Sequence, residues 1–246
     1  MLELYLHLAL KVNYFMNINK QQGFKRTMPP LVLCSGSTAR RAFLAELSDI
    51  IVYPFPKNGL TFGESILENT VENIGAGVSK TQHFKIIQKK WEATQRLLSG
   101  WSGPMDLRWS KYVTIVCDTL VYVNAQGYGK PTSTNDIQKW FQSYLQHEVT
   151  VTTLCIIGWM VNGEVQAWAP LSSEGHIHFT PKAKREIPSF LSSPISTFHR
   201  PVAGGIDVEW FQKLGWVDVS PSDLDTIIGI PWSHIRNEIE AREWKK

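Results

Sequence analysis

Apolar positions along the chain form strand-like runs that alternate with stretches of helical periodicity. The run PLVLC at 30–34 precedes TARRAFLAEL, where apolar side chains recur at helical spacing. A longer run, YVTIVCDTLVYV at 112–123, leads through a turn into STNDIQKWFQSYLQ, where Ile137 and Trp140 share one helical face. Strands mixed with helices predict an α/β or α+β sheet protein.

The segment 149–169 predicts a β-hairpin, because two alternating apolar runs flank Asn162-Gly163, a dipeptide that favours a two-residue turn. Residues 84–111 begin with a helix-like pattern and end in a loop with tryptophan, glycine and proline, so we expect an insertion there. A single domain is expected over 28–246. The apolar and then basic residues 1–27 are interpreted as an N-terminal extension, either disordered or organelle-targeting.

Charge and cysteine content exclude several classes of protein. The formal net charge of +3 is too small to indicate stable nucleic-acid binding. No apolar run reaches the roughly 18 residues of a membrane span, so no membrane association is expected. Cys34, Cys117 and Cys155 are odd in number and lack metal-binding spacing, which predicts reduced core thiols in a cytoplasmic protein.

Small and hydroxyl residues follow the first strand. Ser35, Gly36 and Ser37 fall in a strand-to-helix turn, where backbone N–H groups carry partial positive charge. Arg40 adds a guanidinium suited to bidentate contact with phosphate oxygens. The turn therefore predicts a phosphate site, and a plain helix cap by Ser37 or Thr38 is the alternative.

The same stretch has another interpretation. Cys34 and Arg40 match the C-x5-R loop of low-molecular-weight tyrosine phosphatases, in which a thiolate attacks the phosphate. Those enzymes use an Asp-Pro pair as general acid, and the sequence contains no such dipeptide. A Cys-based phosphatase that uses Cys34 and Arg40 remains an alternative function.

A second group of residues follows the central strand. Asp118 is expected at the end of a strand, and Lys130-Pro131 comes twelve positions later (130 − 118), after a turn. A carboxylate there can hold a divalent metal or deprotonate water, and a returning lysine can neutralise phosphate charge. Together with the turn at Ser35, this pattern predicts hydrolysis of a phosphate ester or phosphoanhydride.

A third group lies toward the C-terminus. Ala203-Gly204-Gly205 predicts a loop that a ligand can approach closely, and Glu209-Trp210 offers an acceptor beside an aromatic ring. An ionised glutamate only accepts hydrogen bonds, so it suits a base edge that presents donors, as guanine does. Trp210 either stacks on the base or belongs to the core.

These three groups together resemble the Maf family, also called septum-formation-inhibitor-like proteins, over about 28–231. The family's Ser-x-Ser-Pro-x-Arg turn is matched by Ser35, Ser37 and Arg40, and its Asp with downstream Lys-Pro by Asp118 and Lys130-Pro131. Its closing pattern of Ala-Gly, Gln or Glu, and Gly-Leu-Pro is matched by Ala203-Gly204, Glu209 and Gly229-Ile230-Pro231.

The resemblance implies an elongated α/β fold of the Maf/ITPase-like type, in which helices flank a mixed sheet and two lobes surround a central cleft, and it suggests a homodimer. It implies a nucleoside triphosphate pyrophosphatase that uses Mg²⁺ or Mn²⁺ to release pyrophosphate. Asp118 would hold the metal or polarise the attacking water. Lys130 would be the second catalytic residue. The substrate would contact Ser35, Ser37, Arg40, Thr119 and Glu209.

A few positions indicate which members of the family, grouped by the nucleotide they prefer, the sequence resembles. Family members that act on 7-methyl-GTP have an aromatic residue before a single arginine in the first motif, and a late glutamate. Arg40 and Glu209 resemble the arginine and the glutamate, whereas Ala39 stands at the aromatic position. The separation of 20 residues between Glu209 and Gly229 (229 − 209) also resembles that branch. Asp118-Thr119, in contrast, resembles members that prefer dTTP and UTP.

The sequence departs from the family at two places. The family's acidic Asp-Glu pair, implicated in metal binding, falls on Lys57-Asn58, and its helical lysine falls near Gly77 or Val78, with Lys80 two or three positions away. A lost carboxylate lowers metal affinity. A nucleotide-binding protein with impaired catalysis is therefore another alternative, unless a nearby acid compensates; the candidates are Glu64, Glu68 and Glu72.

Overall fold

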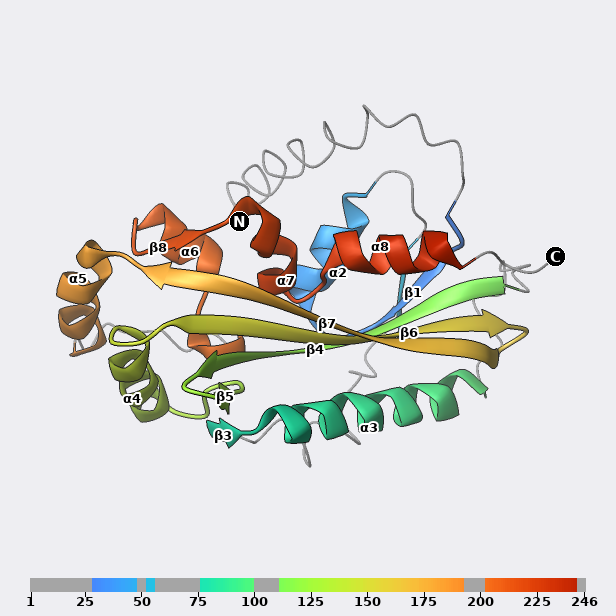
Figure 1. Ribbon diagram of the computed structural model, residues 1–246, viewed down its shortest axis with the longest axis horizontal. Coiled ribbons are helices and arrows are strands. Elements are labelled where there is room, and N and C mark those ends of the chain that lie inside the picture. Colours follow the sequence, from blue (N-terminus) through green and yellow to red (C-terminus); the bar gives the residue numbers. More distant parts are fainter. Residues whose placement is uncertain (1–27, 48–51, 56–75, 100–110, 193–201, 243–246) are drawn as a thin grey trace.

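One eight-stranded mixed sheet forms the centre of the fold, and Figure 1 shows it as an elongated, twisted layer. The computed structural model describes residues 28–47, 52–55, 76–99, 111–192 and 202–242. Six strands follow the order β2-β1-β4-β6-β7-β8, while β5 pairs with β4 and with β3. The strands are β1 (Leu31–Cys34), β2 (Val52–Phe55), β3 (Ala76–Val78), β4 (Lys111–Val123), β5 (Gln126–Tyr128), β6 (Val149–Val161), β7 (Glu164–Phe179) and β8 (Val217–Val219).

Strand direction changes across the sheet. β1 runs parallel to both β2 and β4, whereas β4, β6, β7 and β8 are antiparallel to their successive neighbours. The expected mixed sheet flanked by helices is confirmed. The central cleft remains a prediction.

Helices cover both faces of the sheet. Figure 1 shows α3 along one face, α2, α7 and α8 over the other, and α4, α5 and α6 at one end of the molecule. The described helices are α2 (Thr38–Ala45), α3 (Lys80–Ser99), α4 (Thr134–Tyr144), α5 (Pro181–Ser192), α6 (Val208–Lys213), α7 (Leu224–Ile228) and α8 (Trp232–Ala241); η2 (Ala203–Gly205) and η3 (Pro221–Asp223) are short 3₁₀ turns. Among the described residues, no helix is long and apolar enough to cross a membrane.

Successive β4 side chains point to opposite faces, as the two-residue period of a strand requires. Tyr112 and Val116 pack in one apolar cluster with Ile87 and Trp91 of α3. The odd-numbered residues Val113, Ile115 and Cys117 pack in another cluster, together with residues of α2 and α8. Both faces of β4 are therefore buried, and a charged side chain on it is unfavourable without a partner.

Two turns agree with their sequences. The hairpin between β6 and β7 turns at Asn162 and Gly163, which have φ values of 52° and 82°, as expected from the Asn-Gly dipeptide. The turn between β4 and β5 has the same left-handed backbone at Asn124 and Ala125, with φ values of 49° and 63°. This second turn directs the chain back along β4.

The segment predicted as an insertion at 84–111 differs from that expectation over its first part. Residues 80–99 form the 20-residue helix α3, which packs on β4 and β6 as one layer of the domain. Ile86, Ile87 and Trp91 bury its apolar face. Residues 100–110, the predicted extension 1–27, the departure at Lys57-Asn58 and the compensating candidates Glu64, Glu68 and Glu72 lie outside the described residues.

Candidate active site

Two of the sequence motifs meet where one edge of β4 has no partner among the described strands. β1 pairs with β4 up to Ile115, and β5 pairs with it from Val121 onward. Between these points, the described strands leave the β1-side edge of β4 open at residues 116–120. The opposite edge stays paired with β6 throughout. Asp118 and Thr119 lie in this gap.

The turn after β1 lies against the same gap in the edge of β4. Arg40 Nη1 donates to the Cys117 carbonyl oxygen at 3.1 Å and to Ser35 Oγ at 3.0 Å. The first and second motifs, 77 residues apart between Arg40 and Cys117, are therefore in direct contact. The sequence-based expectation that these motifs form one site agrees with this geometry.

Asp118 and Thr119 point to opposite faces of the sheet. Asp118 contacts side chains of α3, whereas Thr119 Oγ1 accepts a hydrogen bond from Arg40 Nη2 at 2.8 Å on the α7 side. Thr119 Oγ1 also lies 2.9 Å from Thr153 Oγ1, and Thr153 Oγ1 donates to the Thr226 carbonyl oxygen at 2.7 Å. The predicted residues thus divide into an Asp118 cluster and an Arg40 cluster.

The Asp118 cluster is an ion-pair network with α3. Lys90 Nζ lies 2.5 Å from Asp118 Oδ1, and His83 Nε2 lies 3.0 Å from Oδ2. His83 and Lys90 are seven residues apart (90 − 83), which places both on one face of the helix. The side chains are nearly buried, with exposed fractions of 13% for Asp118, 11% for Lys90 and 1% for His83.

These contacts fix the charge of Asp118. Burial alone would raise the pKa of its carboxyl group, but the Lys90 ammonium and the His83 contact outweigh burial and hold the pKa well below the usual range. Asp118 is therefore an ionised carboxylate. Each of its oxygens has one close partner and retains a second lone pair that can accept a hydrogen bond.

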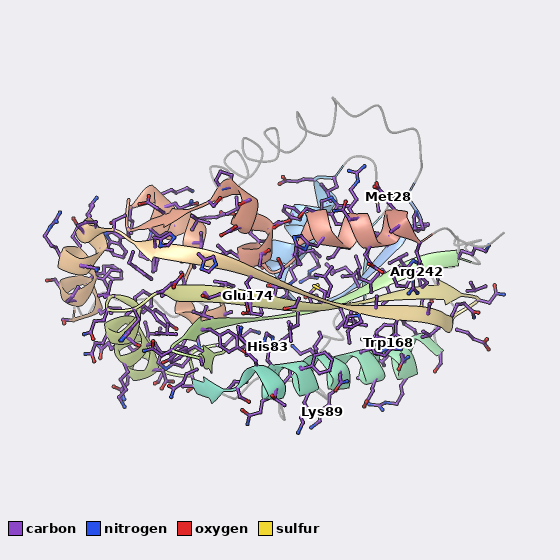
Figure 2. All side chains as sticks on the ribbon, in the orientation of Figure 1. Met28, His83, Lys89, Trp168, Glu174 and Arg242 are labelled. Atoms are coloured by element: carbon purple, nitrogen blue, oxygen red, sulfur yellow. The ribbon has the colours of Figure 1, made fainter. Side chains whose placement is uncertain are left out.

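The network continues toward the molecular surface on the α3 face. His83 Nδ1 lies 3.2 Å from Tyr122 Oη, and the Lys80 ammonium lies 6.0 Å from the centre of the Tyr122 ring. Lys80 Nζ also pairs with Glu174 Oε1 of β7 at 2.7 Å. Figure 2 shows His83 between α3 and the sheet, Glu174 on β7, and Lys89 on the opposite side of α3.

Arg40 acts as a clamp, in the sense that its hydrogen bonds hold together the turn after β1, strand β4 and the end of α7. Besides the two bonds from Nη1 and the one from Nη2, its Nε donates to the Gly229 carbonyl oxygen at 2.7 Å. Four of the five N–H groups of a guanidinium are thus used within the chain. One N–H remains, on Nη2, so this arrangement does not favour the expected bidentate contact of Arg40 with phosphate, which stays a prediction.

The two serines of the first motif support the turn. Ser37 Oγ accepts from the Arg40 backbone N–H at 3.3 Å and caps α2, which confirms the helix-cap interpretation. Ser35 Oγ accepts from the Ser37 backbone N–H at 3.2 Å. Both hydroxyls help to orient the turn, and the phosphate site beside it remains a prediction.

Gly229 of the third motif completes the Arg40 cluster. Its φ of 95° lies in the left-handed region that ends α7. A Cβ atom there would lie 2.7 Å from Thr119 Oγ1 and 2.8 Å from Arg40 Nε. Only glycine fits both the backbone and the space, which gives a physical reason for the Gly-Ile-Pro pattern.

We expect Gly229→Ala to destabilise the protein by about 3 kcal/mol, because backbone strain adds to a clash with polar atoms that cannot separate freely. Urea denaturation of this variant should be compared with that of Gly215→Ala. Gly215 has a similar φ of 68°, but the nearest atom to its added Cβ is Lys182 Cδ at 3.9 Å. Equal losses in both variants would mean that strain alone matters and that the Arg40 cluster is not tightly packed.

Lys130 returns along β4 after the β4–β5 turn. Tyr128 of β5 pairs with Val121, and Lys130 follows two residues later, so the chain runs back toward Asp118. The neighbouring Gly129 carbonyl oxygen accepts from the Gly204 backbone N–H at 2.6 Å. Lys130 is half-buried beside the glycine loop of the third motif, and its catalytic role stays a prediction.

Glu209 lies in the first turn of α6 and is half-buried. Burial, followed by the charge of Glu209, raises the pKa of Glu46 at the end of α2. Glu209 therefore faces the region next to α2. Trp210 packs against Phe190, Phe211 and Trp216, with ring centres 5.5–5.8 Å apart, so its core interpretation is confirmed.

The described residues do not fit a metal held by Asp118. Lys90 and His83 occupy the positions next to both carboxylate oxygens, and a metal there would meet an ammonium group. Within the described ranges, no three His, Cys, Asp or Glu side chains gather closely enough to hold a metal ion. The expectation of Asp118 as a metal ligand therefore stays a prediction that these contacts do not favour.

Cys34 does not have the environment of a nucleophile. Its side chain is 2% exposed and packs with Ile87 and Trp91 below the turn. Burial raises the pKa of the thiol well above its usual value, so the reactive thiolate is disfavoured. This geometry speaks against the Cys-based phosphatase. Cys117 and Cys155 are also buried and reduced, as expected.

Sequence reasoning missed Lys90 and His83. Lys90 lies in the segment interpreted as an insertion and His83 directly precedes it, so no motif led to them. The available signal was a lysine and a histidine on the apolar face of an amphipathic helix, in line with Ile86, Ile87 and Ala93. Charged side chains in that position are rarely buried without an opposite charge.

Comparison with known proteins agrees with this arrangement. The family described as Maf-like protein matches residues 30–242, which include all three motifs and α3. A search of curated proteins found no match. Because the family match covers most of the chain, and its motifs converge on one gap in the sheet, the chain belongs to the Maf-like protein family.

Proposed function

We propose that this Maf-like protein is a nucleoside triphosphate pyrophosphatase that releases a nucleoside monophosphate and pyrophosphate. The carrying observation is the contact between the two motifs at the open edge of β4, where Arg40 bonds to the carbonyl oxygen of Cys117, the residue before the ionised Asp118, whose side chain lies on the α3 face. The family supports this reaction class, because Maf proteins are generally nucleotide pyrophosphatases.

In the proposed reaction, a free lone pair of the Asp118 carboxylate orients the attacking water toward the α-phosphorus. The N–H groups at the start of α2 and the Lys130 ammonium stabilise the negative charge that develops on the phosphates. Mg²⁺ or Mn²⁺ enters as part of the metal–nucleotide complex, which is the substrate. Arg40 keeps the turn, β4 and α7 in register.

Glu209 is proposed to select the base. Its carboxylate can accept hydrogen bonds from the N1–H and 2-amino groups of guanine, but uracil and thymine offer no matching pair of donors. This favours a guanine nucleotide such as 7-methyl-GTP. Thr119, which resembles the dTTP and UTP branch, is engaged with Arg40 and Thr153 and is proposed to hold the site together.

We expect Glu209→Gln to lower kcat/KM for guanine nucleotides about tenfold, because a hydrogen bond to a charged acceptor is lost. Activity toward UTP and dTTP should rise or stay unchanged. Steady-state kinetics on GTP, 7-methyl-GTP, UTP and dTTP checks this. Glu164→Gln, at an exposed strand end, is the control. An unchanged order of preference would exclude Glu209 from base recognition.

The function is tested by incubating the purified protein with Mg²⁺ or Mn²⁺ and canonical or modified nucleoside triphosphates. We expect pyrophosphate in equal amounts with nucleoside monophosphate. Inorganic phosphate that requires Cys34 would indicate a thiol phosphatase. If no product forms but a nucleotide still raises the Tm, the protein binds nucleotides without hydrolysing them. That result would contradict the proposed pyrophosphatase activity.

A further inference from the structure

Lys90 is a nearly buried ammonium that none of the three motifs includes. It lies in α3 between Ile87 and Trp91, which anchor that helix on the sheet, and its Nζ is 2.5 Å from Asp118 Oδ1. Burying an ammonium group is unfavourable unless an opposite charge compensates it. The position of Lys90 is therefore tied to the charge of Asp118.

His83 fixes the other side of the same carboxylate. Its Nε2 lies 3.0 Å from Asp118 Oδ2, while its Nδ1 lies 3.2 Å from the Tyr122 hydroxyl oxygen. The ring is 1% exposed, so it has little freedom to turn away. The two oxygens of Asp118 are held in place by two side chains from one rigid helix.

Binding of a divalent cation to Asp118 would be unfavourable in this arrangement of side chains. The carboxylate charge is already balanced by Lys90, and a metal on Oδ1 would lie within a few ångströms of the ammonium. Like charges at that distance repel strongly in a buried site, where water screens them little. The ammonium and the metal are therefore competitors for one carboxylate.

We propose that Lys90 is a resident counter-ion that takes the place of a protein-bound metal at Asp118, and that His83 positions the second carboxylate oxygen. The free protein then has no divalent-metal site at Asp118. This inference rests on the proposed function for the role of Asp118 in the reaction. Lys90 and His83 act through Asp118 and are positioning residues.

The test is a Mn²⁺ titration of the free protein, without nucleotide, followed by electron paramagnetic resonance. Wild type and the double variant Lys90→Met/Asp118→Asn should bind Mn²⁺ equally, because neither offers a free carboxylate at this position. Lys90→Met alone should gain one Mn²⁺ site at least tenfold tighter than any site in wild type. The control is Lys89→Met, at the exposed neighbouring lysine, which should change nothing.

Two results would overturn the proposal. One is a Mn²⁺ site in wild type that disappears in the double variant, since that site would use Asp118. The other is a folded Lys90→Met protein with no gain in Mn²⁺ binding. If Lys90→Met does not fold, the comparison of wild type with the double variant still decides. No turnover is measured, so the result is independent of whether pyrophosphate release is observed.

Discussion

Asp118→Asn is expected to lower pyrophosphate release at least about 10³-fold, because the amide lacks the negative charge that orients the attacking water. It should also destabilise the protein by about 3–5 kcal/mol, since it removes the negative charge that lies 2.5 Å from the nearly buried Lys90 ammonium. Nearly unchanged stability would be expected only for an exposed aspartate, and Asp118 is 13% exposed.

Activity assays and urea denaturation of the same preparations separate the two effects. The double variant Lys90→Met/Asp118→Asn removes both charges together, so it should regain much of the lost stability while remaining inactive. Asp218→Asn, at an exposed position of β8, controls for the loss of one acidic group. An active Asp118→Asn protein would refute the assigned role, and an unchanged free energy of unfolding would refute the buried ion pair.

Arg40→Lys is expected to destabilise the protein by about 3 kcal/mol although it keeps the positive charge, because hydrogen bonds to charged groups are each substantial. One ammonium cannot replace the planar guanidinium that reaches Ser35, Cys117, Thr119 and Gly229 from separate nitrogen atoms. We also expect an activity loss of about 10²-fold, since the turn and β4 would shift relative to each other.

The neighbouring arginine supplies the control for this variant. Arg41 has an exposed hydrogen bond, from Nη2 to the Gly36 carbonyl oxygen at 3.0 Å, so Arg41→Lys should be nearly neutral. Urea denaturation and kcat should be measured for both variants. If Arg40→Lys raised KM for the nucleotide strongly while leaving stability and kcat unchanged, Arg40 would be a phosphate ligand and not a clamp.

The sequence predicted the parts of the fold that depend on local rules. The Asn162-Gly163 turn follows from the backbone preference of two residues, and β4 follows from a continuous apolar run. The convergence of Asp118 with the turn at Ser35 was also predicted. The separation of Asp118 and Thr119 onto opposite faces follows directly from the period of a strand.

The Asp118 network depends on contacts that no local pattern encodes. Lys90 and Asp118 are 28 residues apart, and their pairing requires α3 to lie across β4 in one register. Arg40 illustrates the same limit, because its residue type suits phosphate and backbone carbonyls equally well. Only the positions of Gly229 and Cys117 show which partners it has in this fold.

Hydrolysis of the preferred nucleoside triphosphate in water enriched in oxygen-18 tests the central claim most directly. Water that attacks the α-phosphorus transfers its oxygen to the nucleoside monophosphate and leaves pyrophosphate unlabelled. Mass spectrometry of both products should therefore find the label in the monophosphate alone. Label in pyrophosphate, or inorganic phosphate as the first product, would contradict the account. In either case water would not have attacked the α-phosphorus, toward which Asp118 is proposed to orient it.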